Sequence, residues 1–145
     1  MPLSPPRDAE GVIPYDDPEI LFDGYVVGRI NPIAHVYTDE NTGERRISTG
    51  AYNRTREPRG GMSIDLGQEL EAAGKGLDAM IEPGFGAVRI RVGDIRGLGL
   101  WVGSDPIIPE NPYHGQVWNY YKKAPRDLHR LDKAWIVQLP GVALR

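Results

Sequence analysis

Apolar and polar residues alternate over short stretches of this chain, and most of these stretches predict strands. Residues 25–30 and 33–37 are rich in β-branched and aromatic types, a composition typical of strands. The polar residues 39–43 predict a reversing turn before a further strand over residues 45–52. We therefore predict a β-hairpin in this part of the chain.

The second half of the chain combines more strands with short helices. Val88 and Ile90 alternate with arginines, which predicts a half-buried strand over residues 87–92. Further strands are expected at residues 62–65, 100–102, 114–118 and 135–139. Residues 68–82 have helical spacing but contain Gly74 and Gly76, so we expect a broken helix there. Pro125 suits the first turn of another helix. The order predicts an α+β fold with a mostly antiparallel sheet and two or three short helices.

Length and charge suggest one domain preceded by an arm. A chain of 145 residues with 40% hydrophobic residues fits a single core. Residues 1–20 contain five prolines and few apolar anchors, so we expect a flexible acidic arm there and the α+β domain over residues 21–145. Residues 1–44 carry nine acids and two arginines, and the remainder carries eleven acids and fifteen bases. A solvated arm is the favoured interpretation, and folding of the acidic segment over the basic body is the alternative.

The chain has no cysteine, no apolar run that would span a bilayer and no signal-peptide pattern at its start. We expect a soluble, cytoplasmic protein that does not engage a membrane. Cysteine-based metal and redox chemistry is excluded. No cofactor motif is complete, so we expect no cofactor.

Two of the three histidines follow an Asn-Pro step, in Asn31-Pro32-Ile33-Ala34-His35 and in Asn111-Pro112-Tyr113-His114. An Asn-Pro step favours a turn, so each histidine is expected just past a bend. If both faced one cleft, His114 and His35 would act as acid and base on a phosphodiester, and Arg29, Arg46 or Arg89 would stabilise the transition state. A metal site from the two histidines with Asp65 or Asp105 is a weaker alternative, because no metal-binding spacing is present.

Several short runs are similar to an uncharacterised family of small bacterial proteins. These runs are RRISTGAY, GMSID, GFGAVRI, IRGLGL and DPIIPENPYHGQVW. The family has a Ser-rich strand, a Leu/Met-Ser-Val/Ile-Asp step and an Asn-Pro-x-His element, and the likeness covers residues 27–135. It implies no activity, but it singles out five positions: Ser48, Ser63, Asp65, Asn111 and His114.

Five arginines fall within fifteen residues, at positions 45, 46, 54, 56 and 59. Guanidinium groups of this density are suited to a phosphate, a nucleotide or an acidic protein. Tyrosines nearby would stack on a base if the ligand carried one. A second basic stretch, from Lys122 to Lys133, contains two aspartates and is interpreted as an ordinary helix surface. The expected ligand-binding residues are Arg46, Ser48, Thr49, Tyr52, Ser63, Asp65, Asn111 and Tyr113.

Clustered arginines without a complete catalytic set favour a small binding or accessory protein. It would engage a protein partner, a larger assembly or an anionic ligand through an Arg-rich hairpin and the edge formed by residues 111–114. The alternative is a metal-independent enzyme that acts on RNA or a nucleotide with His114 as acid or base. The sequence leaves both open.

Overall fold

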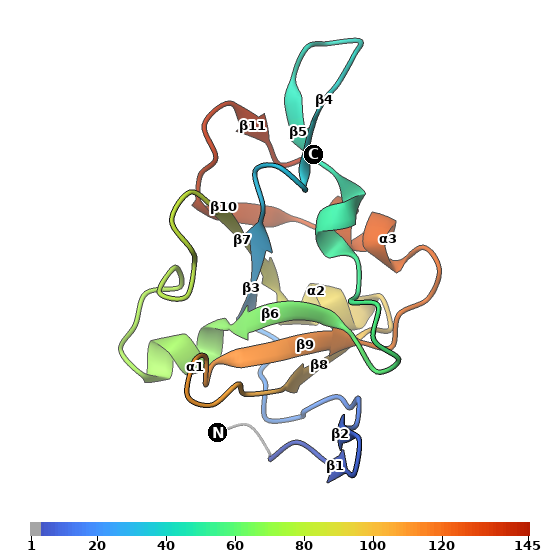
Figure 1. Cartoon of the computed structure of the whole chain (residues 1–145), viewed down its shortest axis with the longest axis vertical. Coiled ribbons are helices and arrows are strands. Elements are labelled where there is room, and N and C mark those ends of the chain that lie inside the picture. Colours follow the sequence, from blue (N-terminus) through green and yellow to red (C-terminus); the bar gives the residue numbers. More distant parts are fainter. Residues whose placement is uncertain (1–3) are drawn as a thin grey trace.

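The computed structural model describes residues 4–145, and its main element is a six-stranded antiparallel sheet (Figure 1). The strand order is β10-β7-β3-β6-β9-β8. The strands are β3 (Tyr25–Ile30), β6 (Met62–Leu66), β7 (Gly86–Arg91), β8 (Trp101–Ser104), β9 (His114–Trp118) and β10 (Lys133–Val137). Together with three short α-helices, this sheet makes an α+β fold and confirms the predicted class.

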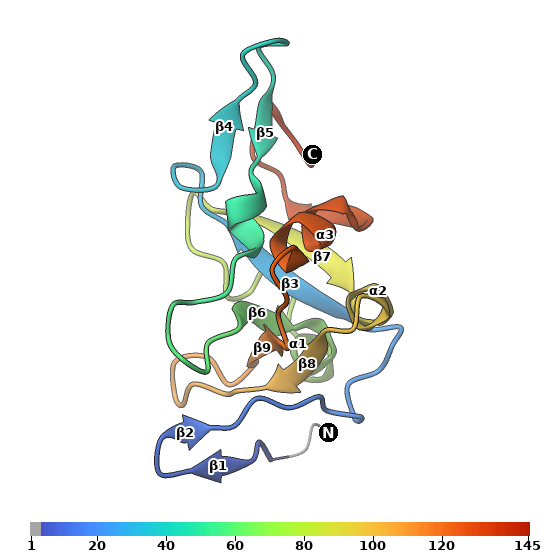
Figure 2. The ribbon, with the colours of Figure 1, turned by 90° about the vertical axis from the view of Figure 1, so that its right-hand side faces the viewer.

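Two smaller sheets extend the molecule at opposite ends. One consists of β4 (Val36–Thr38), β5 (Arg45–Ile47) and β11 (Val142–Ala143). The other pairs β1 (Arg7–Asp8) with β2 (Gly11–Val12). Figure 2 shows the β4–β5 hairpin projecting at one end and the β1–β2 hairpin lying beside β8 and β9 at the other.

The larger part of the core lies on one face of the main sheet. Val26 pairs with both Leu66 and Ile90 in the register, so these three side chains share that face. The face is covered by α2 (Val92–Gly97), α3 (Ala124–Arg130) and the 3-10 turn η1 (Thr49–Tyr52), which contribute Ile95, Leu128 and Tyr52 to the core.

The strand predicted over residues 45–52 stops at Ile47, and the chain continues as the 3-10 turn η1. Both Ala51 and Tyr52 are buried in that turn. An extended strand would place adjacent residues on opposite faces, whereas a helical turn directs both toward the core.

The predicted broken helix also ends early. Helix α1 covers only Gly67–Ala72, and Gly74 follows in the left-handed region at φ 71°. Glycine adopts this conformation without steric cost, so it ends the helix. Leu70 from α1 joins Val27 and Ala87 in a small apolar cluster on the second face of the sheet.

Residues 4–20 of the segment expected to be a flexible acidic arm are placed against the domain, and residues 1–3 lie outside the described part of the chain. Asp17 donates its N–H to the carbonyl of Val102 at 3.0 Å, and Ile20 belongs to the core. Arginines of the body pair with its acids, Arg59 with Asp8 at 2.6 Å and Arg96 with Asp16 at 3.1 Å. These contacts favour the alternative in which the acidic segment folds over the basic body.

Among the described residues, no helix has the length and apolar character that a membrane span requires.

Candidate functional site

Polar residues gather on the second face of the sheet, where three neighbouring strands meet. In β6, Met62, Ile64 and Leu66 point to the main core, so Ser63 and Asp65 occupy the other face. His114 of β9 is opposite Asp65 in the register. We call five residues here the sheet-face cluster: Arg29, Ser63, Asp65, Asn111 and His114.

Asp65 is the centre of the sheet-face cluster. Its side chain is fully buried, and its Oδ1 accepts hydrogen bonds from Asn111 Nδ2 at 2.7 Å and Arg29 Nη2 at 3.3 Å. The second oxygen, Oδ2, lies 3.2 Å from Arg29 Nη2. Arg29 also contacts Glu82 at 3.4 Å and donates to the carbonyl of Met80 at 3.1 Å. A buried carboxylate paired in this way fixes the position of its partners.

The second Asn-Pro step forms the turn that brings Asn111 to Asp65. Asn111 Oδ1 accepts from the N–H of Tyr113 at 3.1 Å, and its backbone exchanges hydrogen bonds with Ile107 at 2.6 and 2.9 Å. This closed turn leads directly into β9. His114 therefore lies just past a bend, as predicted.

His114 is held at both ring nitrogens. Nδ1 lies 2.7 Å from the carbonyl oxygen of Asp105 and 3.8 Å from its carboxylate, and Nε2 lies 3.1 Å from Ser63 Oγ. The Asp105 carboxylate is in turn held by Gln116 Nε2 at 2.6 Å. Because Asn111 is 7% and His114 6% exposed, the edge that they form offers little surface to a partner.

His35 is not part of this cluster. Its Nδ1 accepts from the N–H of Asn31 at 2.9 Å within its own turn, and burial lowers its pKa. Val27 of β3 lies opposite Asp65 of β6, and Asp65 lies opposite His114 of β9. Strand β3 then runs on to Ile30, about 10 Å further along, before the chain reaches His35. The structure places His114 and Arg29 on one face of the sheet with Asp65 between their strands, but gives no support to an acid-base pair of two histidines.

The other expected ligand residues lie apart from the cluster. Arg46 is paired inside its own hairpin with Glu44 at 2.8 Å and Asp39 at 3.6 Å. Ser48 and Thr49 begin the 3-10 turn η1. Tyr52 is fully buried, so no ligand reaches it, and burial raises the pKa of its hydroxyl.

Tyr113 packs against the small apolar cluster around Leu70. Its carbonyl accepts from the N–H of Leu66. It thus helps to fasten the turn before β9.

A cationic hollow lies elsewhere, between the arginine loop after η1 and the segment after β9. It encloses about 390 Å³. Seven residues line this loop groove: Asn53, Arg54, Arg56, Tyr120, Tyr121, Lys122 and Pro125. Three of them are cations and none is a carboxylate.

The sequence interpretation missed the C-terminal side of the loop groove, because it assigned Lys122 to an ordinary helix surface. Helix α3 begins only at Ala124. Tyr120 donates its hydroxyl to the carbonyl of Tyr52 at 2.6 Å, which fastens this segment beside the arginine loop. A pair of tyrosines followed by two lysines was the available signal.

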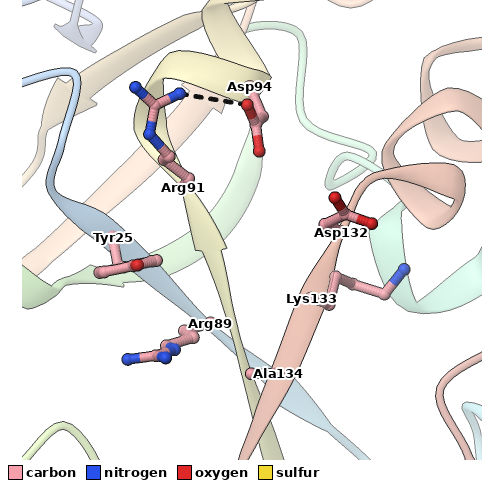
Figure 3. Close-up of a pocket in the computed structure, with 7 residues that line it drawn as sticks. All are labelled: Tyr25, Arg89, Arg91, Asp94, Asp132, Lys133 and Ala134. Atoms are coloured by element: carbon pink, nitrogen blue, oxygen red, sulfur yellow. Dashed lines mark hydrogen bonds and ion pairs between the residues drawn. The ribbon is translucent and has the colours of Figure 1, made fainter.

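A second hollow of about 300 Å³ lies over β3, β7 and β10 (Figure 3). The Arg89 guanidinium stacks 4.5 Å from the centre of the Tyr25 ring, and Arg91 is paired with Asp94 and Asp23, each at 3.2 Å. Lys133 extends its amine away from Tyr25 and Arg89 toward the carbonyls of His129 and Leu131. Burial lowers the pKa of this amine to about 8.

Asp132 also lines this second hollow, so its lining holds two carboxylates beside three cations, Arg89, Arg91 and Lys133. The loop groove, with three cations and no carboxylate, is the better match to an anion.

Within residues 4–145, no three His, Asp or Glu side chains are grouped so that they would hold a metal ion. The chain matches no protein-family model, no curated protein and no solved structure with which it was compared.

Proposed function

We propose that this protein is a small binding protein that takes up an anionic, phosphate-bearing ligand in the loop groove. The observation that carries the proposal is the absence of any carboxylate among the residues that line it, beside Arg54, Arg56 and Lys122. Guanidinium and ammonium groups without a carboxylate partner keep their positive charge available to an oxyanion.

The arginines of the chain divide into paired and available groups. Arg46 and Arg59 form ion pairs within the protein, with Glu44 and Asp8 respectively. Arg54 donates one nitrogen, Nη1, to the carbonyls of Thr55 and Glu57 at 3.2 and 3.3 Å, contacts that orient the side chain without neutralising its charge. Arg56 and Lys122 are exposed at the groove. This division supports the loop groove, rather than the hairpin tip, as the anion-binding surface.

The two tyrosines provide the shape of the site. Tyr121 donates its hydroxyl to Asp127 at 2.8 Å, and Tyr120 donates to the carbonyl of Tyr52. Both rings are thereby held at the groove. An aromatic wall beside clustered cations suits a phosphate attached to a planar group.

Isothermal titration with sodium tripolyphosphate tests the proposal. The wild type is expected to bind, with an affinity that falls as salt is added because exposed charges are screened. Arg56→Ala and Lys122→Ala are each expected to weaken binding by about tenfold, the equivalent of roughly one charge-assisted hydrogen bond.

Matched controls separate the groove from general positive charge. Arg130→Ala and Lys75→Ala remove the same charges from exposed positions that do not line the groove. They should leave the affinity within about twofold of wild type. Absence of binding by the wild type, or equal losses in groove and control variants, would overturn the proposed function.

A further inference from the structure

Ser63 is the one exposed side chain of β6, and it contacts a nearly buried histidine. Its neighbours Met62 and Ile64 are buried, and it stands on the second face of the sheet. Ser63 Oγ lies 3.1 Å from His114 Nε2. A serine hydroxyl in this position is open to solvent on one side and in contact with a base on the other.

The contacts of His114 fix which ring nitrogen carries the proton. The carbonyl oxygen of Asp105, 2.7 Å from Nδ1, only accepts hydrogen bonds, so Nδ1 carries hydrogen in the neutral ring. The lone pair of Nε2 is then directed at Ser63 Oγ, and the hydroxyl donates to it. This is the tautomer that a general base needs in order to take a proton from serine.

The position of the imidazole is further restricted by the residues behind it. Gln116 Nε2 holds the Asp105 carboxylate at 2.6 Å, and Gln116 Oε1 accepts from the N–H of Gly61 at 2.7 Å. Gln116 is opposite Ser63 in the strand register. The serine, the histidine and the aspartate are therefore all attached to one sheet, which keeps them in place before any substrate arrives.

A paired guanidinium group and a small hollow lie in the surroundings of the serine and the histidine. Arg29 contacts Asp65, which lies two residues from Ser63 on the same face, or about 7 Å along the strand. Its side chain remains 22% exposed. A hollow of about 210 Å³ lies behind the pair, where Asp105 and Gln116 line it and Ser63 and His114 do not.

From this arrangement we infer that Ser63 is a nucleophile, that His114 is its general base, and that the protein cleaves carboxylic esters at this site. Ser63 Oγ forms a bond to the carbonyl carbon as its proton passes to His114 Nε2. The bond to the alcohol then breaks, and the proton moves from Nε2 to the departing oxygen. A water molecule then attacks the carbonyl carbon of the acyl-serine as its proton passes to Nε2. The bond between that carbon and Ser63 Oγ breaks, Nε2 returns the proton to Oγ, and the carboxylic acid is released.

A fluorophosphonate probe followed by peptide mass spectrometry tests this inference on the intact protein. The chain has four serines, Ser4, Ser48, Ser63 and Ser104, so the labelled position is unambiguous. We expect label at Ser63 only, and hydrolysis of p-nitrophenyl acetate above the rate in buffer. Ser63→Ala should lose both, and His114→Gln should slow labelling of Ser63 by about 100-fold or more.

Ser4→Ala is the matched control, because it removes an exposed hydroxyl that has no part in the site, and it should react like the wild type. If His114→Gln fails to fold, the wild type and Ser63→Ala still decide the matter, because the Ser63 side chain is exposed and its loss leaves the core intact. A wild type that the probe does not label, or labels at another serine, would overturn the inference. That result would leave anion binding in the loop groove untouched.

Discussion

The sheet-face cluster and the loop groove use similar residue types in opposite ways. In the sheet-face cluster, Arg29 is ion-paired with the buried carboxylate of Asp65, and Asn111 donates a hydrogen bond to the same carboxylate. In the loop groove, Arg56 and Lys122 are exposed beside two tyrosines, with no carboxylate in the lining. Charge that is satisfied internally holds the fold together, and charge left unsatisfied at a hollow is available to a ligand.

The two kinds of charge place different demands on the structure around them. A buried ion pair places its partners accurately, because breaking it leaves an uncompensated charge. Ser63 and His114 gain fixed positions from that neighbourhood. The loop groove needs no such precision, since a flexible cation adapts to an anion by rotating its side chain. The two regions should therefore respond differently to substitution.

The largest expected effect on stability is at Asp65. Asp65→Ala removes the buried acceptor of both Arg29 and Asn111, so the free energy of unfolding should fall by about 3 kcal/mol or more. Urea denaturation at neutral pH measures the loss. The control Asp132→Ala alters a fully exposed side chain and should change stability by less than about 0.5 kcal/mol. A loss below about 1 kcal/mol for Asp65→Ala would contradict the view that the paired charges of the sheet-face cluster stabilise the fold.

The loop groove should show the reverse behaviour. Arg56→Glu places a carboxylate in a lining that has none, so tripolyphosphate affinity should fall by more than about tenfold. Its free energy of unfolding should stay within about 0.5 kcal/mol of wild type, because the side chain is exposed. Titration and urea denaturation of the same preparation test this pair of expectations. A variant that loses stability and binding together would show that the groove is structural.

Tyr52 in the core and Tyr120 at the loop groove should differ in how much stability they lose with the hydroxyl group. The Tyr52 hydroxyl is buried without a hydrogen-bond partner, so Tyr52→Phe should leave stability unchanged or raise it by about 1 kcal/mol. Tyr120→Phe removes a hydrogen bond of 2.6 Å to the carbonyl of Tyr52 and should cost about 1 kcal/mol. Thermal melts of both variants give the order of stability. The opposite order would contradict the assignment of Tyr52 to the core.

The smallest effect is expected in acid, at the ion pair between Asp8 and Arg59. Arg59 lowers the pKa of Asp8 from 3.8 to about 2, so in this window the unfolded chain binds the proton that the folded chain does not. The stabilisation is complete above pH 3.8 and is lost as the pH falls toward 2. Asp8→Asn should flatten the pH dependence of the urea midpoint in this window only. If the urea midpoint of Asp8→Asn changes with pH as steeply as that of the wild type, the N-terminal hairpin does not unfold together with the rest of the domain.

Local patterning predicted much of the fold. The strands β3 and β9 begin and end at the predicted residues, and the helix at Pro125 and the shortened helix before Gly74 follow from local conformational preference. These features depend on residues close together in the chain, so the sequence contains them.

Pairing between distant residues could not be predicted in this way. The sequence marked Ser63, Asp65, Asn111 and His114 as positions of interest, but the register of β6 against β9 decided that they touch. The same applies to Tyr52, whose burial follows from packing of η1 on α3.

By itself, the sequence determined the class of fold, the absence of cysteine chemistry and the turns that precede His35 and His114. Tertiary structure alone decided that His35 stays in its own turn, that His114 faces Ser63, and that Tyr120 and Lys122 join Arg56 around one hollow. The physical reason is that backbone preference acts over a few residues, whereas hydrogen bonds and ion pairs depend on distances that only the folded chain sets.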